Sequence, residues 1–96
     1  MVRLHKRTYN VHTDLLDNIV DRADVVKIDT EGHELEVLKG APRLVAQKPL
    51  FVIENHTKTY GLTYWPEVLE LLGGFKHRYI EGFVEELHFF EPQGIA

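Results

Sequence analysis

Short apolar segments alternate with polar ones along the chain, and their spacing predicts alternating helices and strands. Residues 13–22, TDLLDNIVDR, place apolar side chains on one face of a short helix, with Thr13 as its N-cap. Residues 24–29, DVVKID, are rich in β-branched side chains and predict a strand. Residues 34–41, ELEVLKGA, carry leucines three positions apart and predict a second helix that ends at Gly40.

The rest of the chain continues this alternation. The predicted segments are, in order, a helical turn opened by Pro42 (APRLVAQ), a strand (LFVIE), a polar loop (NHTKTYGLTY), a helix (WPEVLELLGG) and two strands within HRYIEGFVEELHFFE. Strands that alternate with helices favour right-handed crossovers and a parallel sheet. The short connection near Gly82 favours an antiparallel last strand. We therefore expect an α/β fold, and a chain of 96 residues fits a single domain over residues 1–96.

Composition narrows the functional classes. The net charge of −4 argues against sequence-independent nucleic-acid binding, which needs a basic face. The sequence has no cysteine, which excludes disulfides, thiolate catalysis and cysteine-ligated zinc, and it has no serine, which excludes a Ser-His-Asp hydrolase. No apolar stretch approaches the ~20 residues of a membrane span, and no signal peptide is visible. We therefore expect a cytoplasmic protein with no membrane partner.

Polar side chains gather where two of the predicted strands end. Asp29, Glu31 and His33 follow the first of these strands, and Glu54 and His56 end or follow the second. In an open parallel sheet, ligands bind beyond the carboxyl ends of the strands, and consecutive strands are usually neighbours. We therefore expect these five residues to form a catalytic rim, with Asp29 and Glu54 close together. Two carboxylates in such a position repel each other, which raises the pKa of at least one of them.

A purely structural interpretation of the first segment stays open. Asp29 or Thr30 can cap the helix that starts near Gly32, and Glu31 and Glu34 can complement its dipole. His33 can be a solvated residue of the first turn. Three aromatic residues further along are interpreted as a cover over the core, namely Tyr60, Tyr64 and Trp65.

The central segment also carries a longer pattern. A hydrophobic strand ends in K-I-D, the patterns E-G-x-E and L-x-G-A follow, and after a short spacer a second strand ends in glutamate. These positions are Lys27, Ile28, Asp29, Glu31, Gly32, Glu34, Leu38, Gly40, Ala41 and Glu54. In this pattern, and over residues from about 11 to 90, the chain resembles the FkbM family of S-adenosylmethionine-dependent methyltransferases.

The resemblance implies a doubly wound, Rossmann-like sheet, mostly parallel with an antiparallel last strand. It implies methyl transfer to a hydroxyl of a small molecule or sugar, with Asp29, Glu31, His33, Glu54 and His56 as the catalytic residues. Members of the family carry an acidic strand end and a glycine-rich loop ahead of this region, and this sequence has neither. The chain thus corresponds to about the C-terminal half of the family's catalytic domain. S-adenosylmethionine is the implied cofactor, and we expect this chain alone to bind it weakly or not at all.

Two other functions remain open at this stage. The chain can be a binding or assembly module that keeps the fold without the chemistry, acting as a homo-oligomer or with a separate N-terminal half. Alternatively, the same five carboxylate and imidazole side chains can form a metal site for Mg²⁺, Mn²⁺ or Zn²⁺.

Overall fold

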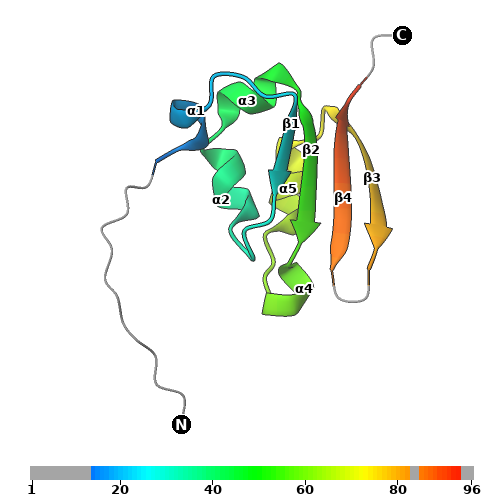
Figure 1. Ribbon diagram of the computed structural model, residues 1–96. Helices are drawn as coiled ribbons and strands as arrows, with labels where there is room; N and C mark the ends of the chain where they lie inside the picture. Colours follow the sequence, from blue (N-terminus) through cyan, green and yellow to red (C-terminus); the bar gives the residue numbers. More distant parts are fainter. Residues whose placement is uncertain (1–13, 83–84, 94–96) are drawn as a thin grey trace, which may run out of the picture.

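The computed structural model in Figure 1 describes residues 14–82 and 85–93. Its strands are β1 (Val25–Ile28), β2 (Leu50–Asn55), β3 (Phe75–Glu81) and β4 (Glu86–Pro92), which form one sheet in the order β1-β2-β4-β3. Its helices are α1 (Leu16–Ile19), α2 (Glu34–Lys39), α3 (Pro42–Gln47), α4 (Thr57–Tyr60) and α5 (Trp65–Leu71). The predicted α/β class is confirmed. Within the described residues, none of these helices has the length and apolar character that crossing a membrane requires.

The last strand is inserted between two earlier ones. β1 and β2 are parallel, whereas β4 is antiparallel to both of its neighbours, β2 and β3. The expected antiparallel last strand is therefore confirmed. A tight connection, with the Gly82 N–H donating to the Glu85 carbonyl at 2.9 Å, returns β4 beside β3, and the other edge of β4 pairs with β2. Only the β1–β2 pairing of this sheet is parallel, so the expectation of a mostly parallel sheet is corrected to a mixed one.

The helices cover one face of this sheet. Side chains alternate along β2, so Phe51 and Ile53 are buried while Val52 and Glu54 are half-buried on the opposite face. The buried face packs against α2 and α5, and its core consists of Ile28, Leu35, Leu38, Phe51, Ile53, Val68, Leu72, Phe75 and Phe90. Figure 1 shows α5 behind the sheet and no helix in front of β2 and β4. The doubly wound arrangement, with helices on both faces, is therefore not found among the described residues.

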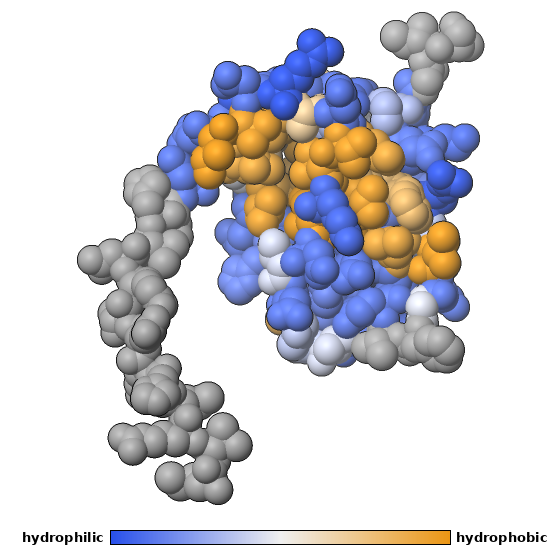
Figure 2. Space-filling model, viewed as in Figure 1, coloured by the Kyte–Doolittle hydropathy of each residue, from blue (hydrophilic) through white to orange (hydrophobic). Residues whose placement is uncertain are grey.

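The helix-free face is apolar over much of its area, as Figure 2 shows from the same side. In the register of the sheet, Val52 lies beside Phe89, and Leu87 lies beside Ile80. Val25 and Ile80, which lie on the two edge strands, are 58% and 63% exposed. A face of this kind favours contact with a further layer of protein.

Two local predictions differ from the structure, and side-chain hydrogen bonds occur at both places. The polar segment predicted as a loop contains α4, which begins where Asn55 Oδ1 accepts hydrogen bonds from the Thr57 N–H at 3.0 Å and the Thr57 hydroxyl at 2.6 Å. Helix α1 is shorter than predicted, and its Asp17 accepts hydrogen bonds from the backbone N–H groups of Arg43 and Leu44 at the start of α3. The predicted cap Thr13 lies outside the described residues.

We expect the chain to associate through the free edge of β1. Among the described residues, β1 pairs with β2 alone, and Val25 on this edge is largely exposed. An unpaired strand edge beside apolar side chains favours the addition of a strand from a second chain. Val25→Lys should therefore raise the dissociation constant of the oligomer about tenfold, because a buried unpaired ammonium is unfavourable. Light scattering after size exclusion, over a range of protein concentrations, measures this change.

The matched control is Ile80→Lys, which places the same charge on the opposite edge strand, β3. It should leave the association unchanged. An equal effect of both variants would mean that the chains associate through the helix-free face as a whole rather than through the β1 edge. A monomer at every concentration would contradict the prediction.

Candidate active site

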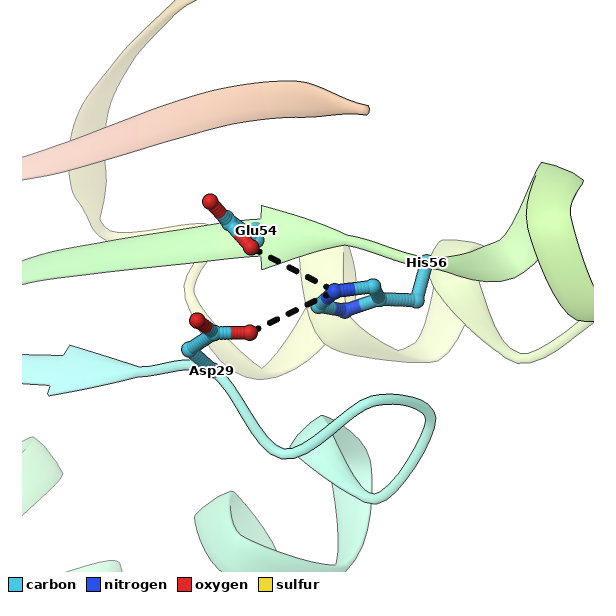
Figure 3. Close-up of side chains that lie close together, drawn as sticks. All are labelled: Asp29, Glu54 and His56. Atoms are coloured by element: carbon cyan, nitrogen blue, oxygen red, sulfur yellow. Dashed lines mark ion pairs between the residues drawn. The ribbon is translucent and has the colours of Figure 1, made fainter. Parts of the chain in front are cut away.

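Three side chains from the ends of β1 and β2 meet at one point. Asp29 follows β1, Glu54 lies in β2, and His56 follows β2. Because Ile28 is opposite Ile53 in parallel register, Asp29 and Glu54 become neighbours at the carboxyl ends of the two strands. His56 Nε2 lies 3.3 Å from Asp29 Oδ1 and 3.3 Å from Glu54 Oε2, and Figure 3 shows both carboxylates beside the imidazole. The predicted proximity of Asp29 and Glu54 is confirmed.

A further carboxylate, that of Glu34, contacts this cluster and is completely buried. One of its oxygens accepts hydrogen bonds from the Thr30 hydroxyl at 2.6 Å and the Gly32 N–H at 2.9 Å. The other oxygen accepts a hydrogen bond from the Tyr64 hydroxyl at 2.8 Å and lies 3.1 Å from His56 Nδ1. Burial raises the pKa of Glu34, but the hydrogen bonds outweigh burial and lower this pKa to about 2. Glu34 is therefore ionised at neutral pH.

The ionised Glu34 determines how His56 presents its two nitrogens. A carboxylate only accepts hydrogen bonds, so His56 donates its Nδ1–H to Glu34, and its Nε2 faces Asp29 and Glu54. Burial lowers the pKa of His56, but the hydrogen bond and charge of Glu34, with the charges of Glu85 and Asp29, outweigh burial and raise it. Burial and the adjacent Asp29 raise the pKa of Glu54. The predicted repulsion between the two carboxylates thus acts on Glu54.

The other two predicted rim residues, Glu31 and His33, are not brought into the cluster. The backbone turns through positive φ angles at Glu31 (53°) and Gly32 (114°), and glycine relieves the strain at the second of these positions. This turn directs the Gly32 N–H to Glu34 and leaves the side chains of Glu31 and His33 exposed. His33 lies at the start of α2 and lines an apolar hollow that it shares with Leu15 of the segment before α1. Of the five predicted rim residues, the structure thus brings together Asp29, Glu54 and His56, and the catalytic role of all five stays a prediction.

Comparison with known protein families assigns the chain to a family. Residues 4–88 match the Methyltransferase FkbM domain, which is most of the chain. The chain belongs to the FkbM methyltransferase family. The resemblance drawn from the sequence is thus confirmed, and the matched range includes Asp29, Glu34, Glu54 and His56. Neither the comparison with curated proteins nor that with solved structures found a match.

Sequence reasoning misses the part that Glu34 and Tyr64 play in this FkbM domain. It assigns Glu34 to the helix dipole, but Glu34 and Leu38 are four residues apart on α2 and both face the core. That spacing, with the position of Glu34 in the E-G-x-E pattern, is the signal that identifies it. Tyr64 packs against the core as expected, yet its hydroxyl also reaches Glu34 from 30 residues further along the chain. No local pattern predicts a contact of that kind.

A second polar network of the FkbM domain joins β2, β3 and β4. Glu86 Oε1 accepts a hydrogen bond from the Asn55 amide at 3.1 Å and lies 3.1 Å from His88 Nε2. His88 is buried, and its Nδ1 lies 2.6 Å from His77 Nε2. Burial lowers the pKa of His88. Burial also lowers the pKa of His77, and repulsion from a proton on His88 lowers it further. The neutral His88 thus donates to Glu86 and accepts from His77, which satisfies buried polar groups across three strands.

Proposed function

We propose that this chain forms the acceptor side of an S-adenosylmethionine-dependent O-methyltransferase site, where a hydroxyl of a small molecule or sugar is held and loses its proton. The main support is that a chain of the FkbM family brings Asp29, Glu54 and His56 together at the carboxyl ends of a parallel strand pair. The side chains of Asp29 and Glu54 are 45% and 31% exposed, whereas that of His56 is 6% exposed. An incoming hydroxyl therefore meets the two carboxylates first.

Glu54 is the residue best suited to take up the proton of the acceptor. Its pKa is raised by burial and by Asp29, which makes it a stronger base than an ordinary carboxylate. Asp29 is more exposed and accepts a hydrogen bond from a second hydroxyl of the acceptor, which orients the acceptor. His56, held by Glu34, offsets the negative charge of the carboxylates from behind. When the proton moves from the hydroxyl to Glu54, the acceptor oxygen keeps the electron pair and becomes the nucleophile.

The cofactor supplies an electrophilic methyl group when it is bound, but the described residues do not form a cradle that fits it. A glycine-rich loop lets such a cofactor approach the backbone closely, and this sequence has no G-x-G-x-x-G motif. Gly32, at the edge of the site, does not open such a space, because a Cβ there would lie 3.1 Å from Leu62 Cδ1. We therefore expect a dissociation constant for S-adenosylmethionine above about 1 mM, and a micromolar value by calorimetry would contradict this.

Transfer of a labelled methyl group tests the proposal at millimolar S-adenosylmethionine, where weak cofactor binding is compensated by concentration. The acceptors are a panel of sugars and polyhydroxylated small molecules. We expect slow transfer to at least one hydroxyl compound, with a rate that falls as the pH drops and Glu54 becomes protonated. An absence of transfer to every acceptor at this cofactor concentration would overturn the catalytic proposal for this chain.

A non-catalytic binding or assembly module is the second candidate, and the apolar helix-free face described above favours it. In that case, the cluster would bind a hydroxylated ligand without transferring a methyl group. Chemical-shift changes at His56 on addition of the same acceptor panel, in the absence of transfer, would support this second candidate.

A further inference from the structure

We infer that Asp29, Glu54 and His56 bind a divalent transition-metal ion such as Mn²⁺ or Zn²⁺, through one oxygen of each carboxylate and through His56 Nε2. The inference goes beyond the proposed methyl transfer and does not depend on it. It rests on the distances between the three ligand atoms, on the orientation of the imidazole, and on the balance of charge around it.

The distances fit a common ion. Metal bonds to carboxylate oxygen and imidazole nitrogen are about 2.0–2.2 Å long, so two neighbouring ligand atoms lie about 3.0 Å apart at a right angle and about 3.4 Å apart at a tetrahedral angle. His56 Nε2 lies 3.3 Å from both Asp29 Oδ1 and Glu54 Oε2. The ligand atoms of the three residues all fall within 4.8 Å of one another. One ion can therefore contact all three with small movements of the two exposed carboxylates.

The orientation of His56 points to a cation independently of these distances. Glu34 accepts the Nδ1–H, so a neutral imidazole turns the lone pair of Nε2 toward Asp29 and Glu54. The carboxylate oxygens there are also acceptors, so the close approach of these three atoms is favourable only when they share a cation, which can be a proton on Nε2 or a metal ion. A carboxylate that holds the far nitrogen of a ligating histidine is the usual outer partner of metal-bound imidazole. Glu34, itself fixed by the Tyr64 hydroxyl, has that position here.

The charge around the imidazole also favours a dication. Asp29, Glu34 and Glu54 place three carboxylates around a single histidine, and Lys27 is the nearby cation that acts on Glu54. A dication offsets two of these charges at the centre of the group, whereas a proton on His56 offsets one.

The ligand set selects the kind of metal. Mixed imidazole and carboxylate ligands suit Mn²⁺ and Zn²⁺, while Mg²⁺ prefers oxygen alone. Because Asp29 and Glu54 are partly exposed, positions on the ion remain open on the solvent side. A hydroxyl oxygen that binds there loses its proton more readily, and the second oxygen of Glu54 stays free to accept it.

Calorimetric titration of the whole chain with Zn²⁺ alone, and with Mn²⁺ and Mg²⁺ in separate runs, tests the inference. We expect a Zn²⁺ site that Asp29→Asn and Glu54→Gln each weaken at least about tenfold, and that Glu34→Gln weakens by about 10–100-fold. Asp29 and Glu54 are partly exposed, so these two variants should keep the fold, which circular dichroism checks. Mg²⁺ should bind more weakly than Zn²⁺ and Mn²⁺.

Two control variants separate this site from zinc binding to other histidines. His33→Gln changes an exposed histidine near the cluster in sequence, and His77→Gln changes one of the paired histidines on β3. Both should leave the Zn²⁺ affinity unchanged. In long-range ¹H–¹⁵N spectra, Zn²⁺ should shift the Nε2 resonance of His56 while its Nδ1 keeps the proton given to Glu34.

Three results would overturn the inference. They are Zn²⁺ affinity insensitive to Asp29→Asn and Glu54→Gln, Zn²⁺ affinity lost in His33→Gln or His77→Gln, and a His56 that is protonated at Nε2 and unmoved by the ion. The titration needs no turnover, so it fails separately from the proposed function. Metal binding without methyl transfer would support the metal site and contradict the proposed catalysis. Methyl transfer without metal binding would support the catalysis and contradict the metal site.

Discussion

Replacing Glu54 with glutamine is expected to lower the rate of methyl transfer by about 10²–10⁴-fold, the usual contribution of a general base. Glutamine keeps the size and the hydrogen bonding of the side chain at the end of β2, but it cannot take up a proton. The raised pKa of Glu54, caused by burial and by Asp29, makes this carboxylate a stronger base than an ordinary one. The loss corresponds to about 3–5 kcal/mol of transition-state stabilisation. Labelled-methyl transfer with the acceptor that the wild-type chain uses measures it.

The matched control is Glu31→Gln, which removes an equally charged carboxylate that lies outside the cluster and is exposed. Its rate should stay within about twofold of the wild type, as expected for a surface residue that touches neither acceptor nor cluster. If Glu54→Gln retains full activity, the proton goes to another group and Glu54 is not the base. A comparable loss in both variants would mean that the charge of the whole edge matters, rather than one proton acceptor.

Local patterns were enough to predict the elements that position the cluster. The β-branched run before Asp29 and the apolar run before Glu54 each form a strand, and β1 ends directly before Asp29 while β2 ends directly after Glu54. The helices α2 and α3 lie between them in the chain, and a helical connection of this kind places two parallel strands side by side. The proximity of Asp29 and Glu54 therefore follows from the sequence through the topology, without any knowledge of distant contacts.

Non-local contacts could not be predicted in this way. The insertion of β4 beside β2 depends on which edge of the hairpin pairs with the earlier strands, and hydrogen bonding to either edge is locally equivalent. Whether Glu31 or Glu34 faces the site depends on a turn with positive φ angles at Glu31 and Gly32. The pattern of a regular helix start does not predict such a turn. Burial of Glu34 is favourable only because Thr30, Gly32, Tyr64 and His56 all bring donors to it.

Glu34 links the stability of the fold to its chemistry. Its carboxylate fixes the imidazole of the cluster, and its α2 neighbours Leu35 and Leu38 belong to the hydrophobic core. The same side chain thus lies at the boundary between the core and the site. A substitution here should be felt in the free energy of unfolding as well as in the orientation of His56.

Replacing Glu34 with glutamine is expected to lower the free energy of unfolding by about 3 kcal/mol at neutral pH. The pKa of Glu34 falls from 4.5 to about 2 on folding, and each unit of difference corresponds to about 1.4 kcal/mol. Glutamine has the same shape, but its NH₂ group is itself a donor. This group would face two of the groups that donate hydrogen bonds to the carboxylate of Glu34. Urea unfolding followed by circular dichroism measures the difference. The control is Glu36→Gln on the same helix, whose side chain is 69% exposed and 3.9 Å from Lys39, and it should change stability by less than about 0.5 kcal/mol.

The pH dependence of that difference identifies its cause. Because folding depresses the pKa of Glu34, its stabilisation is complete above the unfolded pKa of 4.5 and is lost as the pH falls toward about 2. Protonated glutamic acid and glutamine are both neutral and nearly isosteric, so the unfolding free energies of the wild type and Glu34→Gln should converge across this window. The lowered pKa of Glu86 affects both proteins alike and cancels in the comparison. A difference that stays constant from neutral pH down through this window would mean that packing, rather than the ionised carboxylate, supplies the stabilisation.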